Sequence, residues 1–268
     1  MRPPIACAPV GTGPPVLLLH GLGGDRRQAL GLLPHSVDGT RIAPDLPGHG
    51  DTDLVAGESV TFTAFAALTA DLLDTVRSQG EQRVAVVGVS MGAGIAVALA
   101  AVRPDLVERL VLVRPAWLDE RPAPNLAPFR QIARLLRTLG ADTGREAFLR
   151  TPEFRAIEAA APAMATSLLG QFSRPHAVER SEVLDRMPDD LPLPDRDAYA
   201  GLEVETVVVA APDDPVHPES VARTLSGWIP RARLVTVPRK MPDPTEHQLA
   251  VQREVVAALS RARTGEGR

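Results

Sequence analysis

The residue best placed for chemistry is a serine between two glycines, in the motif Gly-Val-Ser-Met-Gly at residues 88–92. An apolar, β-branched run at 84–87 precedes the motif, and an alanine-rich helical pattern at 95–102 follows it. Glycines allow the tight strand-to-helix turn that lifts a serine oxygen clear of a sheet. We therefore predict Ser90 as a nucleophile that attacks a carbonyl carbon. The alternative is an ordinary glycine-rich loop between a strand and a helix.

A nucleophilic serine needs N–H donors for the negative oxygen that develops during its attack. The first strong apolar run predicts a central parallel strand, and it ends in His20-Gly21-Leu22-Gly23-Gly24. Glycines let this backbone approach a ligand without obstruction by side chains. We expect the N–H groups of Leu22 and Met91 to form an oxyanion hole. We expect His20 and Gly21 to support that loop, and His20 is a less favoured candidate for the base.

Two adjacent acids, Asp213 and Asp214, follow the apolar strand pattern at 205–211. The carboxyl ends of parallel strands meet at one edge of a sheet, so these acids share an edge with Ser90. A carboxylate in this position holds an imidazole in the tautomer that accepts a proton from the serine. Of the two, we select Asp214.

The candidate base is His247, in the first turn of the last predicted helix. Asp243, Pro244 and Glu246 form a capping pattern that starts this helix. Apolar residues follow the histidine at i+4, i+8 and i+11, which places it on the inward-facing stripe. The inward position suits either a catalytic base or a structural buried histidine.

The elements that must position these residues alternate between strand and helix patterns. Strand patterns lie at residues 15–19, 41–43, 84–87, 109–113, 205–211 and 233–237. Such alternation predicts an α/β fold with a mostly parallel central β-sheet flanked by helices. Between 119 and 198 the strand pattern gives way to helix signals, so we predict an inserted all-helical lid. The core then comprises residues 1–118 and 199–268.

Most aromatic residues of the chain lie in or beside this predicted insertion. Six of the nine are Trp117, Phe129, Phe148, Phe154, Phe172 and Tyr199. They suit a lid over an apolar substrate, but small amphipathic helices also need bulky residues simply to pack.

Composition and charge exclude several classes of function. The formal net charge of −4 and the interspersed arginines leave no basic stripe for nucleic acid or anionic lipid. Cys7 is the single cysteine, which excludes an internal disulfide and a cysteine-based metal cluster. The glycine spacing at 21–24 does not fit a dinucleotide site. Residues 1–7 lack the apolar core of a signal peptide, and no apolar stretch reaches membrane-spanning length. We therefore expect a soluble, cytoplasmic protein.

These motifs together resemble the α/β-hydrolase fold family, in particular its small lidded esterases, lactonases and C–C bond hydrolases. The matching features are His20-Gly21, Asp-Leu-Pro-Gly-His-Gly at 45–50, the motif at 88–92, and Asp214 with Pro218. The order Ser, Asp, His along the chain is also that of the family. The resemblance implies a serine hydrolase that cleaves an ester, thioester or lactone of an apolar small molecule through an acyl-enzyme. It implies no metal and no organic cofactor.

One feature departs from the family pattern. Members usually carry the histidine in the loop after the last strand, where this chain has Arg-Lys-Met-Pro at 239–242. Either His247 takes the role from a shifted position, or the triad is incomplete. The second possibility keeps open a non-hydrolytic member of the fold, such as a cyclase or a small-molecule binding protein. The sequence leaves the substrate and the oligomeric state undetermined.

Overall fold

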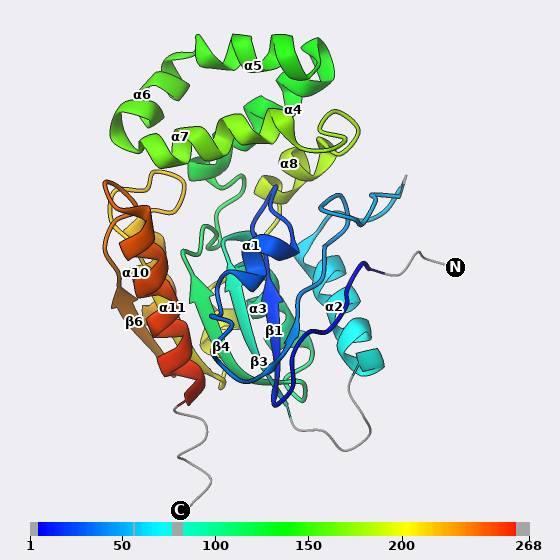
Figure 1. The fold of residues 1–268 in the computed structure, drawn as a ribbon, viewed down its shortest axis with the longest axis vertical. Helices are drawn as coiled ribbons and strands as arrows, with labels where there is room; N and C mark the ends of the chain where they lie inside the picture. Colours follow the sequence, from blue (N-terminus) through cyan, green and yellow to red (C-terminus); the bar gives the residue numbers. More distant parts are fainter. Residues whose placement is uncertain (1–4, 56, 77–82, 261–268) are drawn as a thin grey trace, which may run out of the picture.

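A six-stranded parallel sheet forms the centre of the molecule (Figure 1). The computed structural model describes residues 5–55, 57–76 and 83–260. Residues 1–4, which belong to the stretch predicted to lack a signal peptide, lie outside the described residues. The strand order is β2-β1-β3-β4-β5-β6, and every neighbouring pair is parallel. The strands are β1 Pro15–Leu19, β2 Thr40–Ile42, β3 Val84–Val89, β4 Val107–Val113, β5 Glu205–Ala210 and β6 Ala232–Thr236. The predicted α/β fold with a parallel sheet is confirmed.

Helices cover both faces of this sheet, which explains why the central strands β1 and β3 consist of apolar residues alone. Alternate residues of a strand point to opposite faces. Val86 of β3 packs in the core shared with α2 (Phe62–Val76), α3 (Met91–Val102) and α10 (Glu219–Trp228). Val87 packs in a second core with α1 (Arg26–Leu30) and α11 (Pro244–Ser260). A strand buried on both faces has no position that favours a polar side chain.

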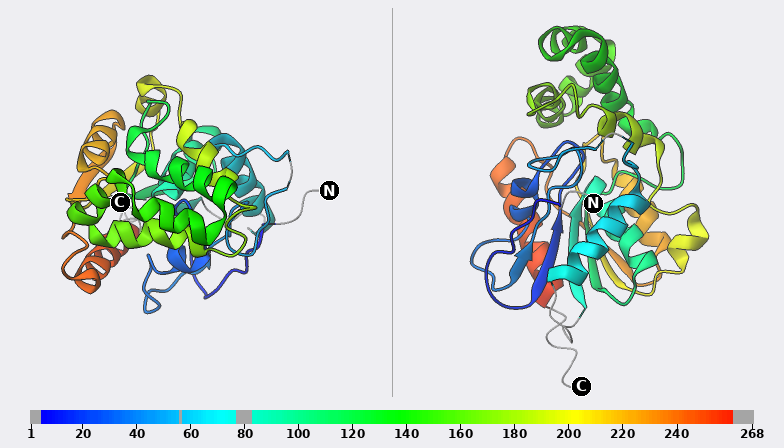
Figure 2. Two further views of the ribbon diagram at one scale, coloured as in Figure 1. Left: turned by 90° about the horizontal axis from the view of Figure 1, so that it is seen from above. Right: turned by 90° about the vertical axis from the view of Figure 1, so that its right-hand side faces the viewer.

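The chain between β4 and β5 is helical and lies over the carboxyl-terminal ends of the strands (Figures 1 and 2). Every residue of 119–198 is described, and none of them lies in a strand. The α-helices are α4 Ala127–Leu139, α5 Ala141–Leu149, α6 Pro152–Ala160, α7 Pro162–Leu169, α8 Glu182–Arg186 and α9 Arg196–Ala200. Short 3-10 turns lie at Pro124–Leu126, Gly170–Ser173 and Met187–Asp189. We call residues 119–198 the helical segment.

The aromatic residues of this region pack its helices together. The ring of Phe148 lies 5.2 Å from that of Phe154 and 5.8 Å from that of Phe172, measured between centroids. All three side chains are buried. These three rings therefore form the core of the helical segment. Packing of small amphipathic helices was one of the two roles that the sequence left open for them. Among the described residues, none of the helices combines the length and the apolarity needed to span a bilayer.

Candidate active site

Ser90 stands on a sharp turn between β3 and α3, with φ 54° and ψ −113°. A Cβ at Gly88 would overlap the backbone of Gly92, and a Cβ at Gly92 would overlap the carbonyl oxygen of Leu19. The turn therefore requires glycine at both positions. The backbone N–H of Ser90 donates to Val113 at 3.0 Å, which ties the turn to the end of β4. This backbone is the strained strand-to-helix turn that exposes a nucleophile at a sheet edge.

The side chain of Ser90 contacts a histidine that the sequence analysis did not select. His217 Nε2 lies 2.9 Å from Ser90 Oγ, and His217 Nδ1 lies 2.8 Å from Asp214 Oδ2. An ionised carboxylate only accepts hydrogen bonds, so Nδ1–H donates to Asp214. Nε2 is then the free acceptor for the serine hydroxyl proton. Ser90, His217 and Asp214 thus form one continuous hydrogen-bonded chain.

Asp214 lies in the turn after β5, where four donors hold its carboxylate. Oδ1 accepts the backbone N–H groups of Val216 at 3.0 Å and of His217 at 3.1 Å. Oδ2 accepts His217 Nδ1–H and also Arg114 Nη1–H, the latter at 3.2 Å. Asp213 points elsewhere, with 58% of its side chain exposed and an ion pair to Arg239 at 3.3 Å. The structure therefore brings Asp214, and not its neighbour, to the histidine.

Burial and charge set the protonation of this pair in opposite ways. Burial alone would raise the pKa of Asp214, but the contacts with His217 and Arg114 outweigh it and hold that pKa well below its ordinary value. The pKa of His217 is lowered chiefly by burial, and the positive charges of Arg114 and Lys240 add to the effect, while Asp214 opposes it. At neutral pH the site therefore holds an ionised Asp214 beside a neutral imidazole, which is the state of a general base.

The prediction that His247 contacts Ser90 is wrong. The predicted helix start is present, because Asp243 Oδ1 accepts two backbone N–H groups of the first turn of α11, each at 2.9 Å. His247 is also buried on the inward stripe of that helix. Its Nδ1–H, however, donates to the carbonyl oxygen of Pro238 at 2.7 Å, in the loop after β6. His247 is the structural buried histidine that the sequence analysis left open.

The candidate oxyanion loop lies directly against Ser90. An ideal Cβ built on Gly21 would come within 3.3 Å of Ser90 Cβ, so the loop after β1 and the serine turn are in contact. Leu22 and Met91 are both buried, and within the described chain no hydrogen-bond acceptor contacts either backbone N–H. Two unpaired buried N–H groups next to a serine suit a site that receives a negative oxygen.

His20 supports this loop and does not contact the serine. Its Nδ1–H donates to Gly21 O at 2.9 Å, and its Nε2 accepts the backbone N–H of Leu46 at 3.1 Å. His49 makes the parallel connection, because its Nε2 accepts the backbone N–H of Gly23 at 3.0 Å. Burial lowers the pKa of both histidines, which keeps each of them in the neutral form that these contacts require. The two rings fasten the 20–24 loop to the turn at 45–50.

A family model described as the alpha/beta hydrolase family matches residues 16–257, which is most of the chain. The chain belongs to the α/β-hydrolase family. It is 31% identical over 255 residues to a Klebsiella pneumoniae protein named as a carbamate hydrolase, RutD, and covers 88% of that protein with 89% of its own length. It is 29% identical over 243 residues to a Pseudomonas putida 2-hydroxymuconate semialdehyde hydrolase, with 84% of this chain and 79% of that protein covered.

Other proteins that are similar to this chain differ from it in length or share only the fold. The chain spans about half the length of an uncharacterized Mycobacterium tuberculosis protein, with 32% identity over 74% of this chain and 54% of that one. A solved structure of an enol-lactonase from Burkholderia xenovorans matches with a TM-score of 0.70, 24% identity and 96% of each chain covered. A likeness at this identity concerns the fold alone.

In this α/β-hydrolase chain the site histidine follows its acid by three residues, within one turn. The signal was present in the sequence as Asp214-Pro215-Val216-His217. The helix pattern after the last strand favoured His247, although His217 follows the acid at the same sheet edge. Asn125 of the helical segment fastens this turn, since its Nδ2–H donates to Val216 O at 2.7 Å. No sequence pattern identified that contact.

Proposed function

We propose that the chain is a serine hydrolase that cleaves an ester, thioester or lactone through an acyl-enzyme on Ser90. The observation that carries this proposal is the hydrogen-bonded chain from Ser90 Oγ through His217 to Asp214, with contacts of 2.9 and 2.8 Å. A serine hydroxyl becomes nucleophilic when an adjacent base accepts its proton, and an acid orients that base. The α/β-hydrolase relatives whose names describe hydrolysis support the same reaction class.

The first half of the reaction transfers the acyl group to the enzyme. Ser90 Oγ forms a bond to the carbonyl carbon while its proton passes to His217 Nε2. Asp214 stabilises the resulting imidazolium through Nδ1–H and stays ionised. The tetrahedral intermediate then collapses, the bond from the carbonyl carbon to the leaving oxygen or sulfur breaks, and His217 returns the proton to the leaving group. The product of this half is an ester on Ser90.

The second half releases the acid. A water molecule attacks the acyl carbon while His217 Nε2 takes its proton. The bond between that carbon and Ser90 Oγ then breaks, and the serine oxygen recovers the proton from His217. In both halves the N–H groups of Leu22 and Met91 stabilise the negative oxygen of the tetrahedral intermediate. The contacts from Ser90 through His217 to Asp214 do not involve His247, and this supports hydrolysis over the non-hydrolytic alternative.

The helical segment 119–198 serves in this proposal as the cap of the site. It lies over the carboxyl ends of the strands (Figure 1). Only 8% of Ser90 is exposed, and Asn125 of the segment holds the turn that carries His217. A covered nucleophile excludes bulk water from the reaction and limits the substrate to small molecules.

The test is hydrolysis of a panel of p-nitrophenyl esters, acyl thioesters and lactones by the purified chain. Ser90→Ala is expected to lower kcat by about 10³-fold or more on every substrate that the wild type cleaves. Ser181→Ala is the matched control, because Ser181 is also a buried serine and lies outside the site. It is expected to keep wild-type turnover. Full activity of Ser90→Ala would overturn the proposal.

A further inference from the structure

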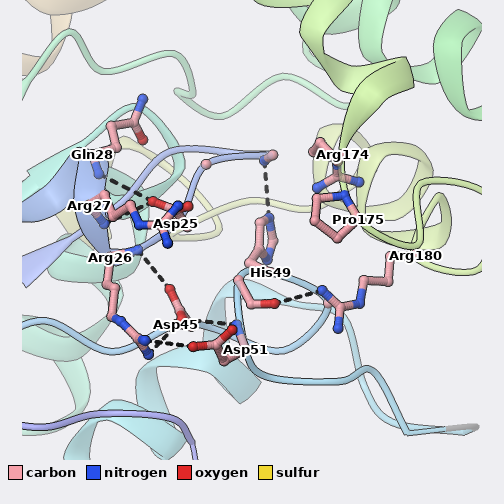
Figure 3. A pocket seen from close by; sticks show the side chains of 14 residues that line it. Asp25, Arg26, Arg27, Gln28, Asp45, His49, Asp51, Arg174, Pro175 and Arg180 are labelled. Atoms are coloured by element: carbon pink, nitrogen blue, oxygen red, sulfur yellow. Dashed lines mark hydrogen bonds and ion pairs between the residues drawn. The ribbon is translucent and has the colours of Figure 1, made fainter.

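Side chains of the helical segment 119–198 tie it to the core at several places. Arg180, which lines a cavity of about 320 Å³ (Figure 3), donates to Gly50 O at 2.8 Å and to Asp53 at 2.6 Å. Asp190 accepts the backbone N–H of Phe62, the first residue of α2, at 2.6 Å. Neither contact involves a member of the candidate triad, which comprises Ser90, His217 and Asp214.

Asn125 differs from these two residues, because it donates to the turn that carries the base. Its Nδ2 group donates to Ala116 O at 3.0 Å, just after β4, and to Val216 O at 2.7 Å, in the turn after β5. An amide nitrogen carries two N–H groups, and each carbonyl oxygen receives one of them. Among the described residues, no other side chain of the helical segment makes a hydrogen bond to residues 211–218.

The contact with Val216 O fixes the peptide group that precedes His217. The N–H of this group belongs to His217 and donates to Asp214 Oδ1 at 3.1 Å. The carbonyl oxygen of the same group belongs to Val216 and accepts from Asn125. A peptide group is planar, so a hydrogen bond at each end fixes the orientation of its plane. The side chain of His217 branches from the chain directly after this plane, and the plane therefore helps to determine where the imidazole lies.

The end of β4 is the common support of the nucleophile and the base. β4 lies between β3, which leads to Ser90, and β5, which leads to His217. The backbone N–H of Ser90 donates to the oxygen of Val113, the last residue of β4. Asn125 connects Ala116, just beyond that residue, to the turn of His217. The contact of 2.9 Å between Ser90 Oγ and His217 Nε2 joins two separate turns, so it depends on this shared support.

We propose that Asn125 is a positioning residue, through which the helical segment holds His217 Nε2 in line with Ser90 Oγ. The proposal rests on the proposed function, because it requires His217 to be the base. Asn125 acts on the base through Val216 O and takes no part in bond breaking. Without its amide, Val216 O has no donor among the described residues, and the peptide group before His217 is free to rotate. The helical segment then has a second role besides covering the site, because its first turn completes the alignment of the base.

The test is the second-order rate of Ser90 labelling by a fluorophosphonate at pH 7.5, which depends on the base and not on the natural substrate. Asn125→Ala removes both donors and is expected to lower this rate about 10- to 100-fold, because a misplacement of about 1 Å costs up to about 10²-fold. Asn125→Asp keeps the size of the side chain but replaces the donors by an ionised acceptor, and it is expected to lose at least as much. On p-nitrophenyl acetate, the loss is expected in kcat, with KM changed less than about 3-fold.

Two comparisons separate positioning of the base from a general weakening of the structure. Asp190→Ala removes a different hydrogen bond between the helical segment and the core, and it is expected to change the labelling rate less than about 3-fold. In a His217→Ala chain, the addition of Asn125→Ala is expected to change the residual rate less than about 2-fold, because a residue that acts through another has no effect once the other is absent. Circular dichroism checks that each variant is folded. An equal loss in Asp190→Ala, or the same loss with and without His217, would overturn the proposal.

Hydrogen exchange distinguishes failure of this proposal from failure of the hydrolase proposal. The backbone N–H of His217 lies at one end of the peptide group that Asn125 holds at the other. Its exchange with solvent, measured by NMR, is expected to be at least about 10-fold faster in Asn125→Ala than in the wild type or in Asp190→Ala. Faster exchange together with an unlabelled wild type would reject the hydrolase function, although Asn125 still holds the turn. A labelled wild type with unchanged exchange and unchanged labelling in both Asn125 variants would keep the triad and reject the role of Asn125.

Discussion

Arg114→Met is expected to move the pH profile of the enzyme toward higher pH. Arg114 follows β4 and donates to the same Asp214 oxygen that accepts His217 Nδ1–H. The substitution has three effects on the imidazole. It removes a positive charge, it frees Asp214 to stabilise the imidazolium, and it lets solvent approach the buried ring. All three raise the pKa of His217, so none of them cancels another.

The structure gives the size of this shift. Arg114 Nη1 and His217 Nδ1 lie 3.2 and 2.8 Å from Asp214 Oδ2, so they are at most about 6 Å apart. Two unit charges at roughly 6 Å and an effective dielectric constant of about 20 interact by about 2.8 kcal/mol, or about two pKa units. Solvent that enters the space left by the guanidinium screens part of this energy. We expect a shift of about one unit.

The assay is kcat/KM as a function of pH from 4.5 to 9, because this quantity reports the ionisation of the free enzyme's base. In the wild type, kcat/KM is expected to rise with pH through an ionisation below the ordinary histidine value of 6.5, since the pKa of His217 is lowered. In Arg114→Met the same rise is expected at higher pH. Arg114→Lys keeps the charge and is expected to stay near the wild type.

The matched control is Arg239→Met. Arg239 pairs with the exposed Asp213 in the neighbouring turn and makes no contact with Asp214 in the described structure. It is expected to leave the profile within about 0.2 pH units. If kcat/KM of Arg114→Met rises at the same pH as the wild type or at a lower pH, the argument that this arginine sets the ionisation of the base is refuted. An equal shift in Arg239→Met would assign the effect to the summed charge around the site.

Three other predictions follow from the same geometry. Asp214→Asn is expected to lower kcat by about 10³- to 10⁴-fold, because an amide no longer holds the imidazole in the tautomer that accepts the serine proton. Asp213→Asn is expected to keep most of the activity. Steady-state kinetics of the two variants check this ranking, and a reversed order would contradict it. His247→Ala leaves Pro238 O without its donor and is expected to reduce the free energy of unfolding by about 1–3 kcal/mol with little effect on kcat, which urea denaturation and turnover together measure. Four histidines have pKa values lowered chiefly by burial, namely His20, His49, His217 and His247. Below about pH 6.5 the unfolded chain therefore binds more protons than the folded one. As the pH decreases, the free energy of unfolding is expected to fall by up to about 1.4 kcal/mol per pH unit for each histidine. A melting temperature that is constant from pH 7.5 to 5.5 would contradict this sign.

The sheet and the nucleophile were predictable because their sequence signals are local. A strand covered on both faces favours apolar residues, so β3 stands out from the chain along its whole length, and β4 does so over residues 110–113. The turn at Ser90 needs glycine at two fixed positions for steric reasons, and this pattern is rare. The rule that parallel strands end at one edge led to the pair Asp213 and Asp214, but it does not distinguish the two acids.

The base was not predictable by the same reasoning, because its position depends on the conformation of one turn. Asp213 adopts a φ of 60°, and the turn after it brings His217 back onto the carboxylate of Asp214. Helical periodicity predicted correctly that His247 faces inward. Periodicity alone does not show that the inward-facing side chain of His247 contacts Pro238 O and not Ser90. Burial of a histidine and its presence in a site are separate properties.

Arg114 was hidden in the sequence. The chain contains 29 lysine and arginine residues, and nothing in their spacing marks this one. Arg114 contacts Asp214 because β4 and β5 are neighbours in the sheet, which brings the residue after β4 to the turn after β5. This contact is long-range, and only the tertiary structure reveals it.

The central claim is that His217, and not His247, activates Ser90. The most direct test is the second-order rate of covalent labelling by a fluorophosphonate, measured at pH 7.5 on the wild type, His217→Ala and His247→Ala. Fluorophosphonates react with an activated serine and need no knowledge of the natural substrate. The account predicts labelling of Ser90 in the wild type, a loss of about 10²- to 10⁴-fold in His217→Ala, and a change of less than about 3-fold in a folded His247→Ala. Rapid labelling of His217→Ala together with loss of labelling in a folded His247→Ala would contradict it.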